Sequence, residues 1–345
     1  MTNRDINSYQ LLTNNRLDVV FKILYLKYIH LKLFELADQV YDKHIEIITN
    51  GIYKEPNSKK KSLNDYKTAF NEIFNSIKRE GFNRNISLIP ISKDCSITNG
   101  SHRLASSIFF NKKVFTKESL EPSHNYDFKI FKERGMNINL IELAVSNYIQ
   151  LSKNNYLAII WPSANKKIDY FSYFKKVIYH KKFRLNAQGA RNFVTLVYQD
   201  HKWIGTFDSA YNGAISKVSE TFKNFSELHL IFFKEDSIKN VDKIKLSLRS
   251  VFGIGKSSIH ITDNDRETRF LSKTLLNYNG FHFLNNAKPF RFEEFHKKLK
   301  IFRDHIFKNN MPLEDFVLCG SSTLGLYGIR DPKDLDYLSS NFDLK

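Results

Sequence analysis

Cysteine is scarce in this chain of 345 residues, because only Cys95 and Cys319 occur and neither belongs to a CxxC pair. The sequence therefore predicts neither a disulfide framework nor a zinc site built on paired cysteines. Long apolar runs are also missing, since the stretches "YLAIIW" and "LHLIFF" are far shorter than the ~20 apolar residues of a membrane helix. The opening "MTNRDINSYQLL" has no apolar core of a signal peptide. We accordingly expect a cytoplasmic protein without a membrane span.

Acidic residues are fewer than basic ones. The chain has 53 lysines and arginines but 36 aspartates and glutamates, which gives a formal charge of +17. This excess favours anionic partners such as nucleotides, phosphosugars or nucleic acid. The lysines are spread through every segment, so charge alone does not choose among these partners. The chain is longer than the ~250 to 300 residues at which a single core stops growing, so we expect two or three domains.

The first 125 residues combine helical and strand patterns. Between Arg16 and Ile48, apolar residues recur at intervals of three and four, which predicts one or two amphipathic helices. A further helix, "DYKTAFNEIFNSIKREG", should end at Gly81, and "ISLIPIS" should follow as a strand. The stretch "TNGSHRLASSIFF" predicts a turn that opens a helix. Residues 1–125 are thus predicted to form a helical lead-in and an α/β domain.

The rest of the chain alternates between strand and helix patterns. Over 150–288 we expect the strands "YLAIIWP", "FVTLVYQ", "LHLIFF" and "SIHIT" between the helices "DYFSYFKKVIYH", "AISKVSETFKNF", "VDKIKLSLRSVF" and "DRETRFLSKTLLN". Such alternation predicts a layered domain in which a sheet packs under helices. Over 289–345, a charged helix "FEEFHKKLKIFRDHIF" should lead to strand "DFVLCG", helix "SSTLGLYGI" and strand "DLDYL".

A Gly-Ser-His-Arg turn that enters a helix offers free backbone N–H groups, a positive dipole end and a guanidinium, which suit a phosphate. This turn resembles the phosphate-binding box of the ParB and sulfiredoxin superfamily, including ParB-like kinases of free serine. The resemblance implies that Gly100, Ser101, His102 and Arg103 hold nucleotide phosphates, and by chain order it makes Glu55 the catalytic base. Ser101 stands where sulfiredoxin has its cysteine, so peroxidase repair is not expected. The alternative is an ordinary helix start whose arginine lies in solvent.

The run "LRSVFGIGKSSIHITDNDRET" resembles the segment of nucleoside diphosphate kinases in which "IRxxFG" leads through a basic residue into a strand that ends in histidine. The start "NNYLAIIWPSANKKIDYFSYFKKVIYHKKFRL" is similar to the first strand and helix of that family, with "IWPSA" in place of "IKPDA". The resemblance covers about 155–288. It implies a ferredoxin-like domain in which His260 is the phosphoryl-carrying nucleophile and Arg249 and Lys256 clamp phosphates.

An imidazole nitrogen can attack a γ-phosphoryl group and pass it on, which splits one transfer into two easier steps. The sequence departs from the family at Trp161, Ser257 and Leu271, where a lysine, an asparagine and a glutamate are expected. Glu267 lies one turn before the expected glutamate and can orient the histidine ring from there. The alternative is that His260 only packs in the core of a degenerate ferredoxin-like domain.

The stretch "LCGSSTLGLYGIRDPKDLDYL" predicts Gly320 and Ser321 at a strand-to-helix turn and Asp334 and Asp336 in a later strand. Aspartates at i and i+2 on a strand point the same way, so both can hold magnesium. The pattern resembles the polymerase-β-like nucleotidyltransferase superfamily, which implies that the Gly-Ser turn grips a nucleotide and the aspartates bind metal and act in catalysis. The third carboxylate of that family comes from a later strand, which has no counterpart because the sequence stops at Lys345, so we expect a partial fold. A salt-bridged turn or an inactive remnant are the alternatives.

These three sets predict an α/β and α+β multidomain protein with a ParB-like domain, a ferredoxin-like domain and part of a nucleotidyltransferase fold. We expect a kinase or nucleotidyltransferase that uses ATP or another nucleoside triphosphate with Mg²⁺. Its acceptor would be a small alcohol or sugar, for example in surface polysaccharide synthesis. The alternative is a ParB-like nucleic-acid-binding or nucleotide-switch protein. It is less favoured because the lysines are evenly spread and no recognition helix is evident.

Overall fold

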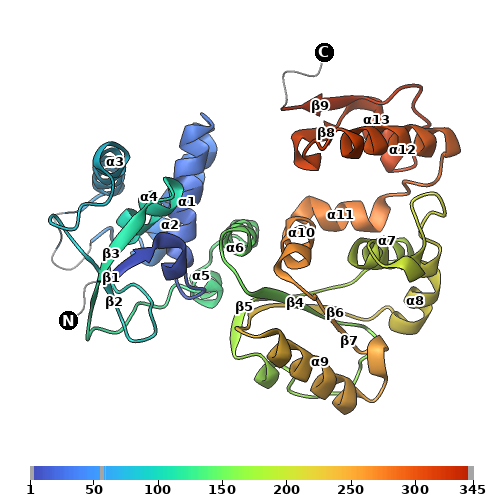
Figure 1. Cartoon of the computed structure of the whole chain (residues 1–345), viewed down its shortest axis with the longest axis horizontal. Helices are drawn as coiled ribbons and strands as arrows, with labels where there is room; N and C mark the ends of the chain where they lie inside the picture. The colour runs from blue at the N-terminus through green and yellow to red at the C-terminus, as the bar shows by residue number, and fades with distance from the viewer. Residues whose placement is uncertain (1–3, 55–57, 59, 341–345) are drawn as a thin grey trace.

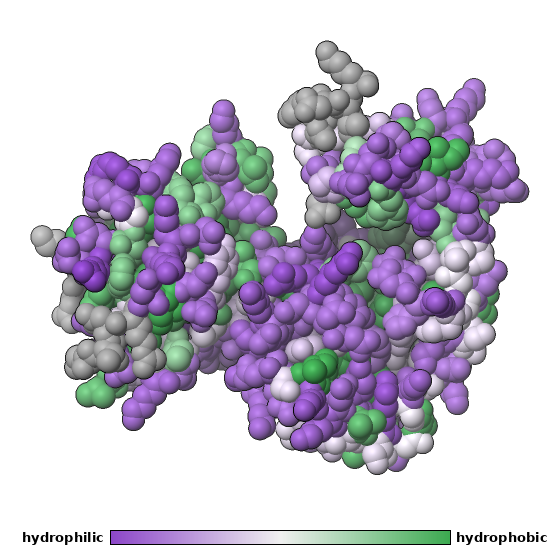
Figure 2. Space-filling model, viewed as in Figure 1, coloured by the Kyte–Doolittle hydropathy of each residue, from purple (hydrophilic) through white to green (hydrophobic). Residues whose placement is uncertain are grey.

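A computed structural model describes residues 4–54, 58 and 60–340. It consists of an N-terminal part up to residue 151, a middle part over 155–286 and a C-terminal part over 293–340, which lies beside the helices of the middle part (Figure 1). Each part has its own small sheet with helices packed around it, so the expected mixture of α/β and α+β elements is present. Hydrophilic side chains cover most of the face seen in Figure 2, which is hollowed between the N-terminal and C-terminal parts.

The N-terminal part is built around one buried helix. It contains β1 (Arg4–Asn7), α1 (Leu17–His30), α2 (Phe34–Ile48), α3 (Leu63–Glu80), β2 (Ile89–Ile91), α4 (Ser101–Phe109), β3 (Lys113–Glu118), α5 (Phe128–Glu133) and α6 (Ile138–Leu151). Strand β3 is central in the sheet, antiparallel to β1 and parallel to β2. The first ten residues of α1 are all buried, because α2, α4 and α6 pack around it. The predicted helices of this part are confirmed, including the cap at Gly81, whose φ of 74° is left-handed.

Helix α6 joins the N-terminal and middle parts. The sequence analysis assigned no element to residues 138–151, yet they form a regular helix that packs on both α1 and α10. Its apolar side chains belong to one continuous core that runs from α1 to one face of the middle sheet. The two parts are therefore packed against each other through a shared core.

The middle part is a four-stranded antiparallel sheet between two layers of helices. It contains β4 (Asn155–Ile160), β5 (Lys176–Phe183), α7 (Ala187–Tyr198), α8 (Gly213–Thr221), β6 (Leu228–Lys234), α9 (Ile238–Phe252), β7 (Ile259–Ile261), α10 (Asp265–Leu275) and α11 (Tyr278–Asn286). The strand order is β5-β6-β4-β7. Helices α7 and α10 cover one face of this sheet and α9 the other (Figure 1). Leu157 and Ile159 of β4 belong to the core that includes α7 and α10, whereas Ala158 and Ile160 belong to the core under α9.

Two predicted elements of the middle part are wrong. The helix expected over "DYFSYFKKVIYH" is a short 3-10 turn followed by β5, because the run from Lys176 to Phe183 pairs with β6 at seven positions. The strand expected over "FVTLVYQ" lies inside α7, where Phe193, Val194 and Val197 form one buried helical face. Asn186 caps that helix by accepting a hydrogen bond from the Gly189 N–H, a local signal that outweighs the β-propensity of the run.

The C-terminal part consists of α12 (Glu293–Lys308), β8 (Phe316–Leu318), α13 (Gly320–Leu326) and β9 (Tyr337–Ser339). The two strands pair antiparallel, and Phe302 of α12 packs against Phe316 and Tyr337 on one face of this ribbon. Along the described chain, every helix is too short or too polar to cross a membrane.

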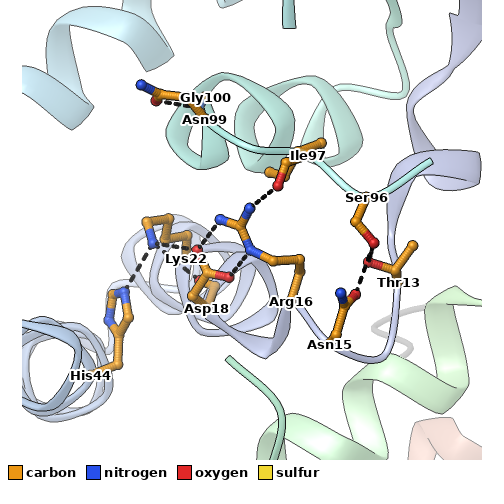
Figure 3. A network of polar contacts seen from close by, with 10 residues as sticks. All are labelled: Thr13, Asn15, Arg16, Asp18, Lys22, His44, Ser96, Ile97, Asn99 and Gly100. Atoms are coloured by element: carbon orange, nitrogen blue, oxygen red, sulfur yellow. Dashed lines mark hydrogen bonds and ion pairs between the residues drawn. The ribbon is translucent and has the colours of Figure 1, made fainter. Parts of the chain in front are cut away.

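A buried ion network fixes the start of α1 (Figure 3). The Asp18 carboxylate accepts hydrogen bonds from Arg16 Nε at 2.7 Å and from Lys22 Nζ at 3.3 Å, and all three side chains are at most 4% exposed. Arg16 also donates to the backbone carbonyl of Ile97, while the Lys22 ammonium lies 3.2 Å from His44 Nε2. Burial alone would raise the pKa of Asp18, but the charges of Arg16 and Lys22 hold it far below its usual range. This carboxylate therefore stabilises the fold above about pH 4, and the contribution is lost as the pH falls toward its folded-state pKa.

We expect Asp18→Asn to lower the free energy of unfolding by about 3 to 5 kcal/mol, because the substitution leaves two buried cations without a counter-charge. Urea denaturation followed by circular dichroism measures the loss. Asp38→Asn is the matched control, since Asp38 forms a surface ion pair with Lys67 and is 53% exposed. Such pairs contribute about 0 to 1 kcal/mol. Equal shifts of the two denaturation midpoints would contradict a special role for Asp18.

Candidate functional site

A pocket of about 610 Å³ opens between α8, α9 and the edge strand β7 in the middle part. Three residues predicted from the sequence, Arg249, Lys256 and His260, line it together. Arg249 comes from the last turn of α9, Lys256 from the 3-10 turn that follows, and His260 from the middle of β7. The structure thus brings one complete set of candidate residues to a single cavity.

His260 points into this pocket because of the alternation along β7. Its neighbours Ile259 and Ile261 face the core under α9, so the histidine ring lies on the opposite face of the sheet. The residue is 7% exposed, and its ring makes an edge contact with Tyr198 at a centroid distance of 4.9 Å. His260 is therefore nearly buried but has one side open to the cavity.

Glu267 orients the imidazole, as the sequence predicts. Its Oε1 lies 3.2 Å from His260 Nε2, and its Oε2 accepts a hydrogen bond from the Asp263 N–H at 2.8 Å. The Asn264 side chain accepts from the Glu267 N–H, so Asn264 and Glu267 cap the start of α10. This cap fixes the position of the carboxylate, which leaves Nδ1 as the ring nitrogen that makes no hydrogen bond to Glu267.

The pocket carries more positive than negative charge. Lys245 pairs with Asp263 at 2.9 Å, and Lys217 pairs with Glu220 at 3.1 Å. Within the described ranges, neither Arg249 nor Lys256 has an ion-pair partner, and the buried Nε of Arg249 has no hydrogen-bond acceptor. A buried polar group without a partner costs about 1 to 3 kcal/mol, so an anion that reached Arg249 would remove this cost.

Two neighbours of His260 have shifted pKa values. Burial favours the neutral form of Asp263, but the hydrogen bond and charge of Lys245 hold the pKa of this carboxyl below its usual range. Burial raises the pKa of Tyr198, whose phenol is therefore neutral near pH 7. Tyr198 is not among the predicted site residues, because the pattern of its segment predicts a strand, whereas the helical phase of α7 places its ring against the histidine.

The Gly-Ser-His-Arg turn opens a helix as predicted, but its histidine and arginine side chains point in different directions. Gly100 caps α4 with a φ of 88°, and the Arg103 guanidinium folds back over it and donates from Nη1 to the Leu88 carbonyl at 3.2 Å. The His102 ring points inward, where its Nε2 lies 2.9 Å from the Tyr41 hydroxyl. Burial and nearby cations lower the pKa of His102 well below its usual value.

Ser101 begins α4 beside these residues, and Glu55 lies outside the described residues. The phosphate-binding role of this turn stays a prediction.

At the C-terminal end, Asp336 meets the Gly320-Ser321 turn. Its Oδ2 accepts from the Ser321 N–H at 3.1 Å and from the Ser321 hydroxyl at 2.9 Å. The prediction that Asp334 and Asp336 lie within a strand is wrong, because β9 begins at Tyr337. The Asp336 N–H donates to the Ser322 hydroxyl and not to a strand partner, and Asp334 lies in an exposed bend.

No family model, curated protein or solved structure matches this chain. Among the described residues, the set around His260 lines a cavity together with Arg249 and Lys256, which form no ion pair there. Among the described residues, no group of three or more histidine, cysteine, aspartate or glutamate side chains is arranged to hold a metal ion.

We expect Lys245→Ala to raise the pKa of Asp263, because the substitution removes the ammonium that stabilises the charged carboxylate while the carboxyl stays partly buried. Carbon-detected NMR titration of the Asp263 carboxyl measures the change. Lys243→Ala, an exposed change on the same helix, is the control and should leave the titration unaltered. Identical titration curves in wild type and Lys245→Ala would show that the pair does not govern this carboxylate.

Proposed function

We propose that the middle part is a phosphotransferase that carries the γ-phosphoryl group of a nucleoside triphosphate on His260 and passes it to a hydroxyl of a small alcohol or sugar. One observation supports this above all. A histidine in contact with Glu267 opens on the same cavity as Arg249 and Lys256, two cations without an ion-pair partner among the described residues. A histidine that only packed would not need two uncompensated cations beside it.

In the first step, His260 Nδ1 attacks the γ-phosphorus, the bond from that phosphorus to the bridging oxygen breaks, and the nucleoside diphosphate leaves. Glu267 stabilises the positive charge that develops on the ring through Nε2. In the second step, the acceptor hydroxyl oxygen attacks the phosphorus and the phosphorus–nitrogen bond breaks. The hydroxyl proton passes to solvent, and the imidazole returns to its starting form.

The pocket cations suit the charge of this reaction. Arg249 can make paired hydrogen bonds to phosphate oxygens, and Lys256 supplies a compact positive charge. A magnesium ion that arrives with the nucleotide would offset further phosphate charge, and Glu220 and Asp263 are the pocket carboxylates whose oxygen chemistry suits it.

The sheet topology supports the fold that the resemblance implies. Strands β4 and β5 run parallel with β6 between them, and β6 and β7 run parallel with β4 between them. Interleaving of two split units is found in ferredoxin-like domains. Only β6–α9–β7 has the crossover helix of such a unit, because β4 leads to β5 through a 3-10 turn, and α7 and α8 lie between β5 and β6. The strand order therefore supports this fold, whereas the first unit departs from it. The long crossover helix α9 between β6 and β7 leads directly to the pocket cations.

We expect γ-labelled nucleoside triphosphate with Mg²⁺ to give an acid-labile, base-stable phosphoenzyme in the full chain, because phosphorus–nitrogen bonds hydrolyse in acid. His260→Ala should abolish the label, since it removes the nucleophile. Rapid quench followed by scintillation counting at acidic and basic pH measures the label bound to the protein. His305→Ala, which changes an exposed histidine of α12, is the control. A label that persists in His260→Ala would refute the proposal.

A second activity, nucleotidyl transfer, is supported by the bonding of Asp336 to the Gly-Ser turn. A two-metal reaction needs carboxylates for both ions, and none joins Asp334 and Asp336 within the described chain. We therefore expect slow or undetectable transfer of an α-labelled nucleotidyl group with Mg²⁺. Any transfer should disappear in Asp336→Asn but not in Asp331→Asn, an exposed control. Transfer that is unchanged in Asp336→Asn would exclude this role.

A further inference from the structure

A second pocket, of about 530 Å³, lies where the N-terminal and middle parts meet. Lys129 and Asp127 of the N-terminal part line one side. Phe171, Lys175 and His180, from the segment that leads into β5 and from β5 itself, line the other. None of these residues belongs to the three sets that the sequence analysis identified.

This junction pocket is separate from the His260 pocket. His180 lies on the edge strand β5 and His260 on the opposite edge strand β7, three strand spacings apart, which is about 14 Å. The two side chains also lie on opposite faces. His180 pairs with Ile231, which faces the core under α9, whereas His260 faces away from that core. One small ligand cannot reach both histidines.

The junction pocket has uncompensated positive charge. Within the described part of the chain, neither Lys129 nor Lys175 forms an ion pair, while Lys176 pairs with Asp236 at 3.2 Å. The pocket carboxylate, Asp127, accepts hydrogen bonds from the N–H groups of Lys129 and Ile130 and so caps α5. These hydrogen bonds fix the Asp127 carboxylate without neutralising it, so its single negative charge faces the two ammonium groups of Lys129 and Lys175 and the pocket keeps a net positive charge.

The same pocket has an aromatic wall. The Phe171 ring makes an edge contact with the His180 ring at 5.0 Å, and Phe174 is buried against Phe233 at 4.8 Å. Burial and nearby lysines lower the pKa of His180, so its imidazole is neutral near pH 7 and can hydrogen-bond in either sense. Aromatic rings beside cations recognise a flat ring that carries an anionic group.

We propose that the junction pocket binds a small phosphorylated molecule with a flat ring, the chemistry of a nucleoside monophosphate, as a ligand separate from the group-transfer site. The ammonium groups of Lys129 and Lys175 would form ion pairs with the phosphate, and the aromatic wall would pack against the ring. Because the walls come from both parts, the bound ligand stabilises the packing of the N-terminal part on the middle part.

Photolabelling of the full chain with 8-azido-AMP, followed by peptide mapping, tests this proposal. We expect label in the peptide that contains Phe171 to His180, with at least tenfold less label in Lys129→Ala/Lys175→Ala. The control Lys78→Ala/Lys153→Ala, which changes two exposed lysines elsewhere, should keep the label, as should His260→Ala. Circular dichroism establishes that each variant is folded.

Competition experiments then distinguish recognition of the ring from recognition of the phosphate. Unlabelled AMP should suppress labelling of this peptide at concentrations at which inorganic phosphate does not. Equal suppression by phosphate would overturn recognition of the ring. Label confined to peptides of the His260 pocket, or undiminished label in Lys129→Ala/Lys175→Ala, would overturn the site.

Discussion

The pairing of β4 with β6 on one side and β7 on the other is the constraint on which the rest of the middle part depends. All six residues of β4 are buried, because both faces of the strand are covered and both edges are paired. Register follows from this pairing: Ile159 lies opposite His260, so a shift of β7 by one residue would turn the imidazole into the core under α9. The candidate nucleophile is thus placed by backbone hydrogen bonds more than by its own contacts.

The chain handles buried charge in two contrasting ways. Around Asp18, the side chains of Arg16 and Lys22 share one carboxylate, and Arg16 donates a further hydrogen bond to a backbone carbonyl. The partners of these charged groups therefore all come from the protein. In the His260 pocket, Glu220 and Asp263 form ion pairs with Lys217 and Lys245, and the buried Nε of Arg249 has no acceptor among the described residues. The first arrangement supplies every charge from within the protein, whereas in the second an anion would supply the missing acceptor.

The sequence predicted the parts of the site that local patterns determine. The alternation around His260 and the orienting carboxylate of Glu267 lie within nine residues, so the strand, the direction of the ring and its partner follow from short-range rules. The Asn264 cap that holds Glu267 in place was not predicted. Tyr198 was missed because valine and phenylalanine suggest a strand, and only packing against the sheet shows the helical phase of α7. The junction pocket was not predicted for a different reason. Its two walls, Lys129 on one side and the segment from Phe171 on the other, are more than forty positions apart and meet only because the N-terminal and middle parts pack together.

The geometry also limits how an acceptor can enter. In the proposed mechanism, the phosphoryl group is held on His260 between two transfers, and the junction pocket lies at the opposite edge of the sheet, whose edge strands are about 14 Å apart. The acceptor must therefore enter the His260 pocket itself, after the nucleoside diphosphate has left. Donor and acceptor then use the same 610 Å³ and the same cations in turn. An acceptor that carries its own anionic group would pair with Arg249 and Lys256 as the nucleotide does, and this favours a charged sugar or alcohol over a neutral one.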